Sequence, residues 1–462
     1  MGNKITKKHI LHCSMFLLGC FGILFCYLVY IQVFQADELS VNPLNRRGAS
    51  LDITRGSILD CHGEQLAFSS RPGERRYPFG AVMAPVTGYV GEALGSSGLE
   101  NMLGDELSGQ SRLLRNLGPA GQLLQSDRGS DIRLTVDAGV QQAAYDALGG
   151  RRGAVVVLDA ATGGVLAMVS TPSVDPEQVE AQWAELSKSE DSPLLNRAAN
   201  GLYPPGSTIK VLIADAALDE KVTDLNETFE CGGRLQIGDT YIGESHGAVH
   251  GRVNLKEALT HSCNYTFGTL AMRMHGSGLE DAFKRFGFAD TFTGEIQESK
   301  CHLPKFGSLG DGDTAQVGIG QGELLVTPLR MAMLAGAYAN GGKMMVPYLV
   351  DEVVSPQGVV IRKASPARWR DATTEQRAAV IDGFMENVVQ NGTGAGAAVE
   401  GVRVTGKTGT AENPSGAEHG WFIGTAELHG RSIAFAIIVE NGGSGSVALP
   451  IARQIILALN NR

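Results

Sequence analysis

The sequence lacks the features that mark several large classes of protein. Basic residues are outnumbered, because 39 Lys and Arg stand against 49 Asp and Glu, for a formal net charge of −10. The chain therefore lacks the excess of positive charge that a nucleic-acid-binding protein normally presents. It contains no internal repeat and no long low-complexity tract, and its 60 glycines follow no fibrous repeat. The length of 462 residues, with a normal apolar content, predicts two or three globular domains.

Cysteine is also scarce, and its arrangement argues against a metal centre. The seven cysteines form no CxxC pair and have no histidine nearby at the spacing of a zinc site. The sequence therefore predicts no metal and no cofactor. The outer cysteines are expected to be free thiols, although a disulfide among them stays open. Three cysteines lie in or beside the first apolar segment (Cys13, Cys20 and Cys26), and four follow it (Cys61, Cys231, Cys263 and Cys301).

A long apolar segment near the N-terminus decides the compartment. Three lysines among the first eight residues are followed by no formally charged residue until Asp37, and about 20 apolar residues suffice to cross a bilayer as a helix. Lysines before the segment and acidic residues after it place the N-terminus in the cytoplasm. A cleaved signal peptide fits less well, because the apolar run is long and continues past the lipoprotein-like Leu17-Leu18-Gly19-Cys20. We expect a cytoplasmic tail over residues 1–8 and an uncleaved transmembrane anchor over residues 9–35.

Beyond the anchor, the chain divides into two regions of different pattern. Residues 36–150 are rich in Gly, Ser and Arg with short apolar pieces, and they predict a small accessory domain of irregular α+β character. Residues 151–462 begin and end with strand patterns and carry mostly helical patterns between them. This order predicts one α+β domain in which the first and last strands share a sheet.

The elements of the larger domain are predicted from apolar runs and turn residues. Turn residues between the first two strand patterns predict a hairpin. The predicted strands are 153–158, 165–170, 421–426 and 433–439. The predicted helices are 207–218, 255–261, 265–274, 328–339 and 449–459.

The segment Pro205-Gly206-Ser207-Thr208-Ile209-Lys210 carries a serine and a lysine three residues apart. Pro-Gly stops the preceding chain, so Ser207 is expected at or near a helix N-terminus with Lys210 on the same helix face. A serine hydroxyl becomes a nucleophile when an adjacent base takes its proton, and a lysine amine can serve if burial or a nearby positive charge lowers its pKa. The N–H groups of the helix start also offer donors to a developing oxyanion. Alone, this SxxK pattern is better explained by a serine cap and a surface lysine.

Two further motifs follow in the chain. Ser262-Cys263-Asn264 ends a helical pattern and supplies a hydroxyl able to relay a proton and an amide able to hold a substrate carbonyl or N–H group. Lys407-Thr408-Gly409-Thr410 follows an apolar-alternating segment and is predicted to lie on a strand. There the lysine and hydroxyls can bind a carboxylate, while Gly409 lets a substrate backbone approach the strand edge. Each motif alone also fits a purely structural role, but their order SxxK, SxN, KTG predicts acyl-enzyme chemistry on Ser207.

This motif set resembles that of penicillin-binding proteins and class A β-lactamases. The chain as a whole is similar to the class B penicillin-binding proteins, the monofunctional peptidoglycan D,D-transpeptidases of bacterial division and elongation, in their small-pedestal subgroup. The resemblance implies a mostly antiparallel sheet of about five strands with helices on both faces, and an extracytoplasmic catalytic domain anchored in the bacterial cell membrane. Further segments that carry it are Arg55–Asp60, Gly63, Leu66-Ala67, Gly98-Leu99-Glu100, Leu134–Asp137, Gly153–Pro172, His246-Gly247, Gly320-Gln321-Gly322 and Thr327-Pro328.

The resemblance also implies a role for the residues of the first two motifs. Ser207 would be the nucleophile and Lys210 its base. Ser262 would shuttle the proton to the leaving amine, and Asn264 would hold the donor peptide.

The third motif would complete the site. Lys407 and Thr408 would support proton transfer and bind the terminal carboxylate of the substrate, and Gly409 would admit its backbone. The backbone N–H groups of Ser207 and Thr410 would form the oxyanion hole. Lys407 would also supply a positive charge that keeps the base lysine neutral.

The implied partners are stem peptides ending in D-Ala-D-Ala, β-lactam antibiotics and a SEDS-type glycosyltransferase in the membrane, with no nucleic acid. The sequence departs from the family at Cys61-His62, where Arg-Asn is commoner, which puts contacts of the accessory domain in doubt. It has neither a glycosyltransferase domain nor a C-terminal wall-binding repeat.

Other functions remain open from the sequence. A D,D-carboxypeptidase uses the same residues with water as acceptor. A serine β-lactamase fits less well, because the Glu-x-x-Leu-Asn box of class A enzymes is missing and Cys263 replaces their Asp. A β-lactam sensor or a division scaffold is the non-enzymatic alternative, and the intact motifs argue against it.

Overall fold

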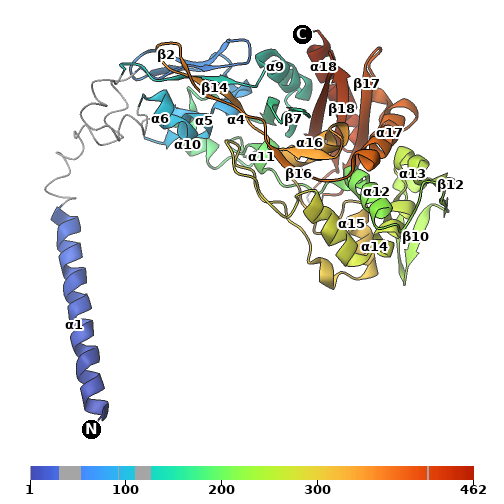
Figure 1. The fold of residues 1–462 in the computed structure, drawn as a ribbon, viewed down its shortest axis with the longest axis horizontal. Coiled ribbons are helices and arrows are strands. Elements are labelled where there is room, and N and C mark those ends of the chain that lie inside the picture. Colours follow the sequence, from blue (N-terminus) through green and yellow to red (C-terminus); the bar gives the residue numbers. More distant parts are fainter. Residues whose placement is uncertain (1, 31–53, 92, 110–125, 414–415, 462) are drawn as a thin grey trace.

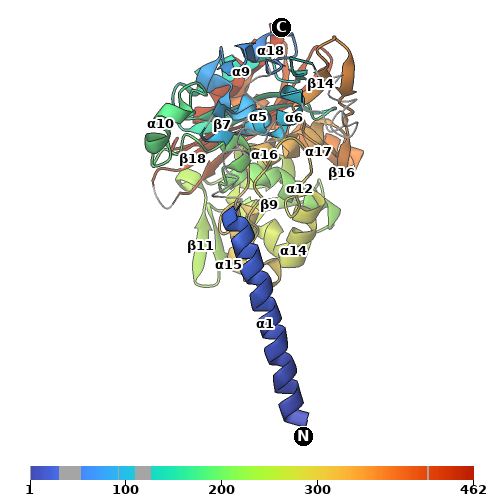
Figure 2. The ribbon, with the colours of Figure 1, turned by 90° about the vertical axis from the view of Figure 1, so that its left-hand side faces the viewer.

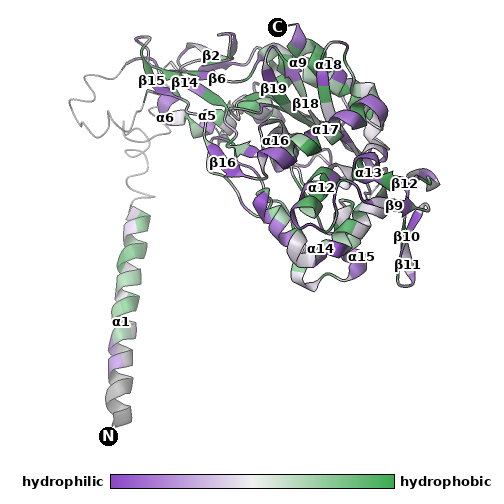
Figure 3. Ribbon diagram, turned by 45° about the vertical axis from the view of Figure 1, so that its right-hand side comes forward, coloured by the Kyte–Doolittle hydropathy of each residue, from purple (hydrophilic) through white to green (hydrophobic). Residues whose placement is uncertain are grey.

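A computed structural model of the chain describes residues 2–30, 54–91, 93–109, 126–413 and 416–461 (Figure 1). The first element is a helix, α1 (Gly2–Val29). Its segment from His12 to Val29 has a mean hydropathy of 2.0 and is exposed throughout, and it is long and apolar enough to cross a membrane. Figure 3 shows the apolar colouring of this helix. The last part of the predicted anchor, residues 31–35, lies outside the described residues.

A five-stranded antiparallel sheet forms the centre of the larger domain, as predicted. Strands from the beginning and the end of the domain are neighbours in it, because β19 pairs with β7 from Ile433 opposite Asp159 to Val439 opposite Gly153. Strand β17, which carries the KTG motif, lies at one edge. In spatial order the strands are β17 (Arg403–Ala411), β18 (His419–Leu428), β19 (Arg431–Val439), β7 (Gly153–Asp159) and β8 (Val165–Thr171).

The sheet is buried on both faces, which explains why its central strands read as continuous apolar runs rather than alternating ones. In β7, Val156 faces one hydrophobic core and its neighbours Val155 and Val157 face another. The second core is closed by α9 (Ala138–Leu148) and α18 (Leu449–Asn460), which lie together in Figure 1. The first core contains the helices next to the SxxK and SxN motifs, together with two further helices. They are α12 (Lys210–Asp219), α13 (Leu255–His261) and α14 (Asn264–Arg285), with α16 (Pro328–Ala339) and α17 (Glu375–Asn391).

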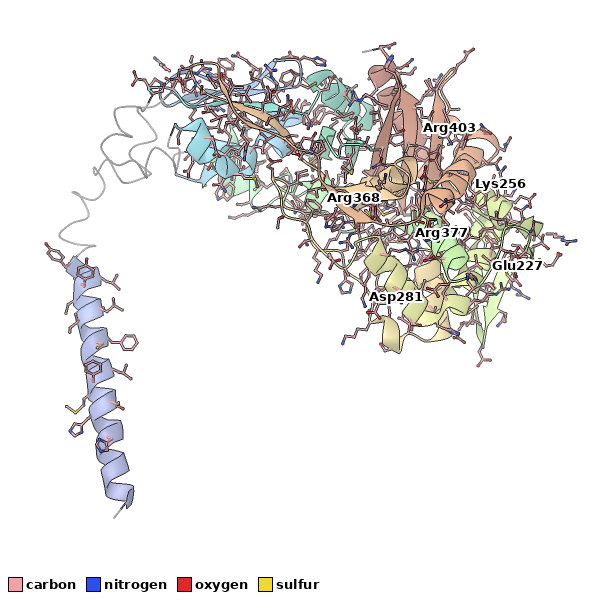
Figure 4. All side chains as sticks on the ribbon, in the orientation of Figure 1. Glu227, Lys256, Asp281, Arg368, Arg377 and Arg403 are labelled. Carbon is pink, nitrogen blue, oxygen red and sulfur yellow. The ribbon has the colours of Figure 1, made fainter. Side chains whose placement is uncertain are left out.

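Strand β17 is tied to the neighbouring helix α17 by charge. The side chain of Arg403 lies within 2.8 Å of carboxylate oxygens of Asp382 and Glu386 on α17, and of Glu427 on β18. Figure 4 shows Arg403 at this place. These contacts fix the start of the strand whose later residues form the KTG motif.

Smaller elements complete the larger domain. Two-stranded sheets pair β9 with β12, β10 with β11 and β13 with β16. Figures 1 and 2 show the β10–β11 hairpin projecting from the end of the domain near α14 and α15. Their bounds are β9 (Thr228–Cys231), β10 (Arg234–Ile237), β11 (Thr240–Gly243), β12 (Gly251–Asn254), β13 (Lys343–Met345), β16 (Arg368–Asp371), α10 (Val179–Leu186), α11 (Arg197–Asn200) and α15 (Asp311–Gly318).

The accessory region forms a second sheet of six strands in the order β15-β14-β6-β1-β2-β3. Two of these strands, β14 and β15, come from within residues 151–462, whereas α9 from residues 36–150 packs on the larger domain. A domain boundary after residue 150 therefore does not separate the two domains, because each domain contains a segment from the other side of that boundary. The strands are β1 (Ile58–Leu59), β2 (Gln65–Arg71), β3 (Glu74–Arg76), β6 (Asp131–Leu134), β14 (Val350–Val354) and β15 (Val360–Lys363).

A buried carboxylate joins two segments of the accessory region that are far apart in sequence. The Glu100 side chain, in α5 (Gly98–Met102), is fully buried and lies 2.7 Å from Arg55 and 2.6 Å from Arg75. Gly56, next to Arg55, packs so closely on Ser130 that an added Cβ would lie 1.8 Å from its carbonyl oxygen. The Arg-Gly and Gly-Leu-Glu segments thus hold the accessory sheet together.

Candidate active site

Ser207 lies in a tight turn directly before helix α12. Residues Gly206–Ile209 form a 3₁₀ turn, and α12 begins at Lys210. Residues three apart eclipse one another in a 3₁₀ helix, so Ser207 and Lys210 share a face as predicted. Two side-chain hydrogen bonds stabilise this turn. Thr208 Oγ1 donates to the Pro205 carbonyl at 2.6 Å, and Trp421 Nε1 donates to the Pro204 carbonyl at 3.0 Å.

Glycines allow two other segments to press against this turn. Gly206 has a left-handed φ of 52°, and a Cβ there would lie 2.4 Å from the Thr410 carbonyl oxygen. Gly320, with φ of 80°, accepts the Gly206 N–H group at 2.9 Å, and a Cβ on it would lie 2.0 Å from the Gly206 carbonyl oxygen. The Gly320-Gln321-Gly322 segment is therefore a support of the serine turn.

The second motif lies at a junction between two helices. Helix α13 ends at His261. Its C-cap, Ser262, adopts a left-handed conformation with φ of 61°, and Cys263 is the N-cap of α14. Non-glycine residues rarely occupy this region, and those that do are often held there at functional sites. The sharp reversal brings the side chains of Ser262 and Asn264 together around the amine of Lys210.

The Ser262 hydroxyl lies between the two lysines of the motif set. Its Oγ is 3.4 Å from Lys210 Nζ and 2.9 Å from Lys407 Nζ. Lys210 Nζ also lies 2.6 Å from the Ser262 carbonyl oxygen and 2.6 Å from Asn264 Oδ1. Within the described part of the chain, no hydrogen bond joins Lys210 to Ser207. The amine of Lys210 is therefore held by the SxN motif, on the helix face that it shares with Ser207.

Both lysines are fully buried, and burial lowers the pKa of each. The pKa of Lys210 falls to about 8, chiefly because burial disfavours its charged form, while the negative charge of Glu244 raises it in part. Burial also holds the pKa of Lys407 well below its usual value, and the neighbouring Lys210 lowers it further. Desolvation, more than the charge of Lys407 expected from the sequence, is thus the main reason that Lys210 can be neutral.

The free edge of strand β17 faces the serine turn. The Thr410 carbonyl oxygen lies against Gly206, and the N–H and C=O groups of one strand residue point to the same side. The Thr410 N–H group therefore points to the unpaired edge where Ser207 lies. This is the placement that an oxyanion hole made of the Ser207 and Thr410 N–H groups requires.

The other KTG side chains are more enclosed than the sequence suggested. Lys407 Nζ donates to its neighbour's carbonyl at 2.8 Å, and Thr408 Oγ1 lies 2.6 Å from Thr393 Oγ1. A Cβ on Gly409 would lie 2.8 Å from Thr208 Cγ2 and 3.0 Å from the Pro205 carbonyl oxygen. The glycine is therefore required by the approach of the serine turn, a reason different from the expected approach of substrate.

Glu244 is a residue of the site that sequence reasoning missed. It is 7% exposed, and its two carboxylate oxygens accept the N–H groups of Asn264 at 2.8 Å and Tyr265 at 2.7 Å. A carboxylate at a helix N-terminus is stabilised by the unpaired N–H groups and the helix dipole. Glu244 thereby fixes the start of α14, and Gly243 beside it accepts Asn264 Nδ2 at 2.8 Å. A lone acidic residue after a hairpin belongs to no motif, and only the nearby His246-Gly247 hinted at this segment.

Glu244 also belongs to a cluster that could hold a metal. The ligand atoms of Cys231, Glu244, His250 and Cys263 all lie within 4.8 Å of one another. The sequence predicted no metal site, because these residues are spread over four segments with no recognisable zinc spacing.

Comparison with known proteins identifies the families that the two domains match. Residues 153–457 match the family described as penicillin binding protein transpeptidase domain, and residues 55–117 match the penicillin binding protein A dimerisation domain. The chain is 34% identical to the peptidoglycan D,D-transpeptidase PbpA of Mycobacterium tuberculosis, over 92% of this chain and 94% of that protein. It is 31% identical to the peptidoglycan D,D-transpeptidase MrdA of Acinetobacter baumannii, over 82% of this chain and 65% of that protein.

Solved structures agree over most of the chain. The imipenem acyl-enzyme complex of penicillin-binding protein A from M. tuberculosis superposes with a TM-score of 0.83 and 32% identity, covering 89% of this chain and 99% of that one. The D,D-transpeptidase domain of a peptidoglycan glycosyltransferase from Eggerthella lenta gives a TM-score of 0.81 and 32% identity, covering 88% and 98% of the two chains. With the motif geometry, these matches over both domains place the chain in the penicillin-binding protein transpeptidase family, in its class B branch.

Proposed function

We propose that this protein is a D,D-transpeptidase that cross-links peptidoglycan stem peptides through an acyl-enzyme on Ser207. One observation carries the proposal: the Ser262 hydroxyl lies within 3.4 Å of Lys210 Nζ and 2.9 Å of Lys407 Nζ, beside the serine turn. The Ser262 hydroxyl can therefore relay a proton between the base Lys210 and a leaving group, while Ser207 lies on the same helix face as that base. The relatives named as D,D-transpeptidases and the β-lactam acyl-enzyme structure of a related protein support it.

In the acylation step, Ser207 Oγ attacks the carbonyl carbon of the penultimate D-alanine while its proton passes to the neutral amine of Lys210. The oxyanion accepts hydrogen bonds from the N–H groups of Ser207 and Thr410. When the intermediate collapses, the C–N bond breaks and the proton reaches the leaving amine through the Ser262 hydroxyl. D-Alanine then departs, and the remaining peptide stays on Ser207 as an ester.

In the transfer step, an amine of a second stem peptide attacks this ester. Lys210 takes a proton from the attacking amine, a new amide bond forms, and Ser207 recovers its proton. Water in place of the amine gives D,D-carboxypeptidase activity from the same residues. The two activities are distinguished by products, which are a cross-linked dimer in one case and a shortened stem peptide with free D-alanine in the other.

The buried position of Lys407 supports different roles for the lysine and the threonines of the KTG motif. Its Nζ is bonded to Ser262 Oγ and to the Thr408 carbonyl oxygen, so its proposed role is proton transfer. The hydroxyls of Thr408 and Thr410 are proposed to bind the terminal carboxylate. Asn264, whose Oδ1 lies 2.6 Å from Lys210 Nζ, is proposed to orient the base as well as to hold the donor peptide.

Labelling with a fluorescent penicillin followed by peptide mapping tests the nucleophile. The label should be found on the peptide that contains Ser207, and Ser207→Ala should abolish it in a protein that stays folded. Ser308→Ala, which changes an exposed serine away from the motifs, is the matched control and should label like the wild type. Labelling retained by Ser207→Ala refutes the mechanism.

We also propose the orientation expected from the sequence, with residues 1–8 in the cytoplasm and the catalytic domain outside. The exposed α1 and the lysines that precede its apolar segment support it. In spheroplasts, a membrane-impermeant maleimide should label the exposed Cys61 before lysis, and a Cys61→Ser variant provides the background. Labelling of Cys61 only after lysis contradicts this orientation.

A monofunctional transpeptidase needs a source of nascent glycan strands, and we propose that a SEDS-type glycosyltransferase is the membrane partner. Gly19 and Gly22 of α1 have open space around them, which would let a neighbouring helix approach closely. Replacing α1 with an unrelated span should leave penicillin labelling intact and weaken co-purification of the glycosyltransferase. Unchanged co-purification after exchange of both the span and the accessory domain contradicts the proposal.

A further inference from the structure

A buried cluster of two thiols, a carboxylate and an imidazole lies directly behind the SxN motif. Cys263 and Cys231 are fully buried or nearly so, Glu244 is 7% exposed, and the His250 side chain is 14% exposed. The four residues come from separate segments: Cys231 ends β9, Glu244 follows β11, His250 precedes β12, and Cys263 separates α13 from α14. The fold thus gathers four potential metal ligands at one point.

Three of the separations between the ligand atoms fall in the range of a tetrahedral zinc site. Zinc binds thiolate, imidazole and carboxylate ligands at about 2.0–2.3 Å, so the ligand atoms of a tetrahedral site lie about 3.3–3.8 Å apart. Cys231 Sγ lies 3.5 Å from His250 Nδ1 and 3.4 Å from Glu244 Oε1, and Cys263 Sγ lies 3.3 Å from the same Oε1. His250 Nδ1 is 3.9 Å from the other carboxylate oxygen, a separation that a small side-chain rotation closes.

Hydrogen bonding of the two thiols to Glu244 accounts for the cluster less well. Oε1 already accepts the N–H group of Tyr265 at 2.7 Å, so both thiols would have to share the remaining capacity of one oxygen. The sulfur of Cys263, in turn, accepts a hydrogen bond from Thr266 Oγ1 at 3.4 Å. Burial and the neighbouring Glu244 carboxylate raise the pKa of this thiol, so a metal has to displace its proton on binding.

We propose that Cys231, Glu244, His250 and Cys263 bind one zinc ion and that this ion fixes the SxN motif in place. Two thiolates with one imidazole and one carboxylate are a ligand set that suits zinc better than magnesium or calcium. Binding replaces the two thiol protons, which are released, by Zn²⁺. The net charge of the cluster therefore stays at −1, and the ion acts on the active site through position rather than through a change in charge.

The positional effect follows from the chain. Cys263 lies between Ser262, whose hydroxyl contacts both lysines, and Asn264, whose amide contacts Lys210. A metal bond to Cys263 restrains both neighbours and ties them to the β10–β11 hairpin through Glu244. Since a displacement of about 1 Å in a catalytic group can cost up to about 100-fold in rate, removal of the ion should slow acylation of Ser207 by about 10- to 100-fold. This consequence rests on the proposed transpeptidase function, whereas metal binding itself does not.

Metal content of the full-length protein in detergent, purified under reducing conditions, tests the binding. We expect one zinc per chain, and loss of that zinc in Cys231→Ser and in His250→Ala. The matched controls are Cys301→Ser and His302→Ala, which alter a buried cysteine and an exposed histidine outside the cluster and should retain it. Substituted Co²⁺ should show thiolate charge-transfer absorption in the wild type, and this absorption should weaken in Cys231→Ser.

Three results overturn the proposal. They are substoichiometric zinc in the wild type after dialysis against zinc sulfate, zinc content unchanged by both cluster variants, and a disulfide between Cys231 and Cys263 in the freshly isolated protein. Chelation of the wild type avoids dependence on the folding of variants: it should slow penicillin acylation and Zn²⁺ alone should restore it. An acylation rate unchanged by complete removal of zinc overturns the positional role. A zinc-loaded protein that never acylates would instead contradict the transpeptidase assignment.

Discussion

Replacing Gly409 with alanine tests whether this glycine is needed by the protein or by the substrate. The added Cβ would lie 2.8 Å from Thr208 Cγ2, 3.0 Å from the Pro205 carbonyl oxygen and 3.1 Å from Trp421 Cβ, which is about 0.3–0.6 Å inside ordinary contact. Strand β17 and the serine turn must therefore separate by about half an ångström. Overpacking of this kind typically costs about 1–3 kcal/mol of stability, and a half-ångström shift of the nucleophile should slow acylation by about tenfold.

The assay measures two quantities on the same protein. Denaturant unfolding gives the loss of stability, and a fluorescent penicillin gives the second-order acylation rate constant. Gly383→Ala is the control, because Gly383 lies inside helix α17 with open space around it and alanine should stabilise that helix by up to about 1 kcal/mol. If Gly409 served only to admit substrate, Gly409→Ala would lose acylation at unchanged stability, and that result would refute the packing argument.

Three other predictions follow from the buried charges. The acylation rate should rise about tenfold per pH unit below about pH 8 and level off above it. The reason is that only the neutral amine of Lys210 accepts a proton, and burial lowers the pKa of this amine to about 8. An acylation rate that stays constant between pH 6 and about 8 contradicts this prediction. Lys210→Ala should slow acylation by on the order of 10²–10⁴ and Ser262→Ala by less, as measured by stopped-flow labelling, and the reverse order counts against the assignment of base and shuttle. Glu100→Gln should lower the free energy of unfolding by about 3–5 kcal/mol, because it leaves Arg55 and Arg75 partly buried without their charge partner. The folded fraction of this variant should still be labelled by penicillin. A denaturation curve that coincides with that of the wild type excludes this role of Glu100.

The sequence was most informative where a local pattern and a chemical requirement coincide. Apolar runs bounded by turn residues predicted the strands at both ends of the larger domain, and pairing of β19 with β7 confirmed that they share a sheet. The spacing of Ser207 and Lys210 predicted a common face at a helix start, and the 3₁₀ turn before α12 provides it. These features depend on residues three or four positions apart or on the two-residue period of a strand, which a sequence displays directly.

Features that depend on contacts between distant segments could not be predicted in this way. Nothing near Val350–Val354 indicates that this strand crosses back to pair with β6 in the accessory sheet. The sequence left open whether burial or a nearby charge lowers the pKa of Lys210, because the burial that does so comes from the whole core. Glu244 acts on residues 20 positions away in the chain, so no motif scan includes it.

Cys263 shows that the unspecified middle residue of the SxN motif can have a structural role of its own. In the SxN pattern the middle residue is unspecified, because only its neighbours point toward the lysines. The left-handed turn at Ser262 directs the intervening side chain to the opposite side of the junction, where it is fully buried and contacts Glu244 at 3.3 Å. That carboxylate in turn holds the N–H groups that begin α14. A substitution of Cys263 therefore alters the position of the Ser262 hydroxyl through the backbone turn that joins the two residues. A middle residue that anchors this turn from behind can tune the proton relay without touching the substrate.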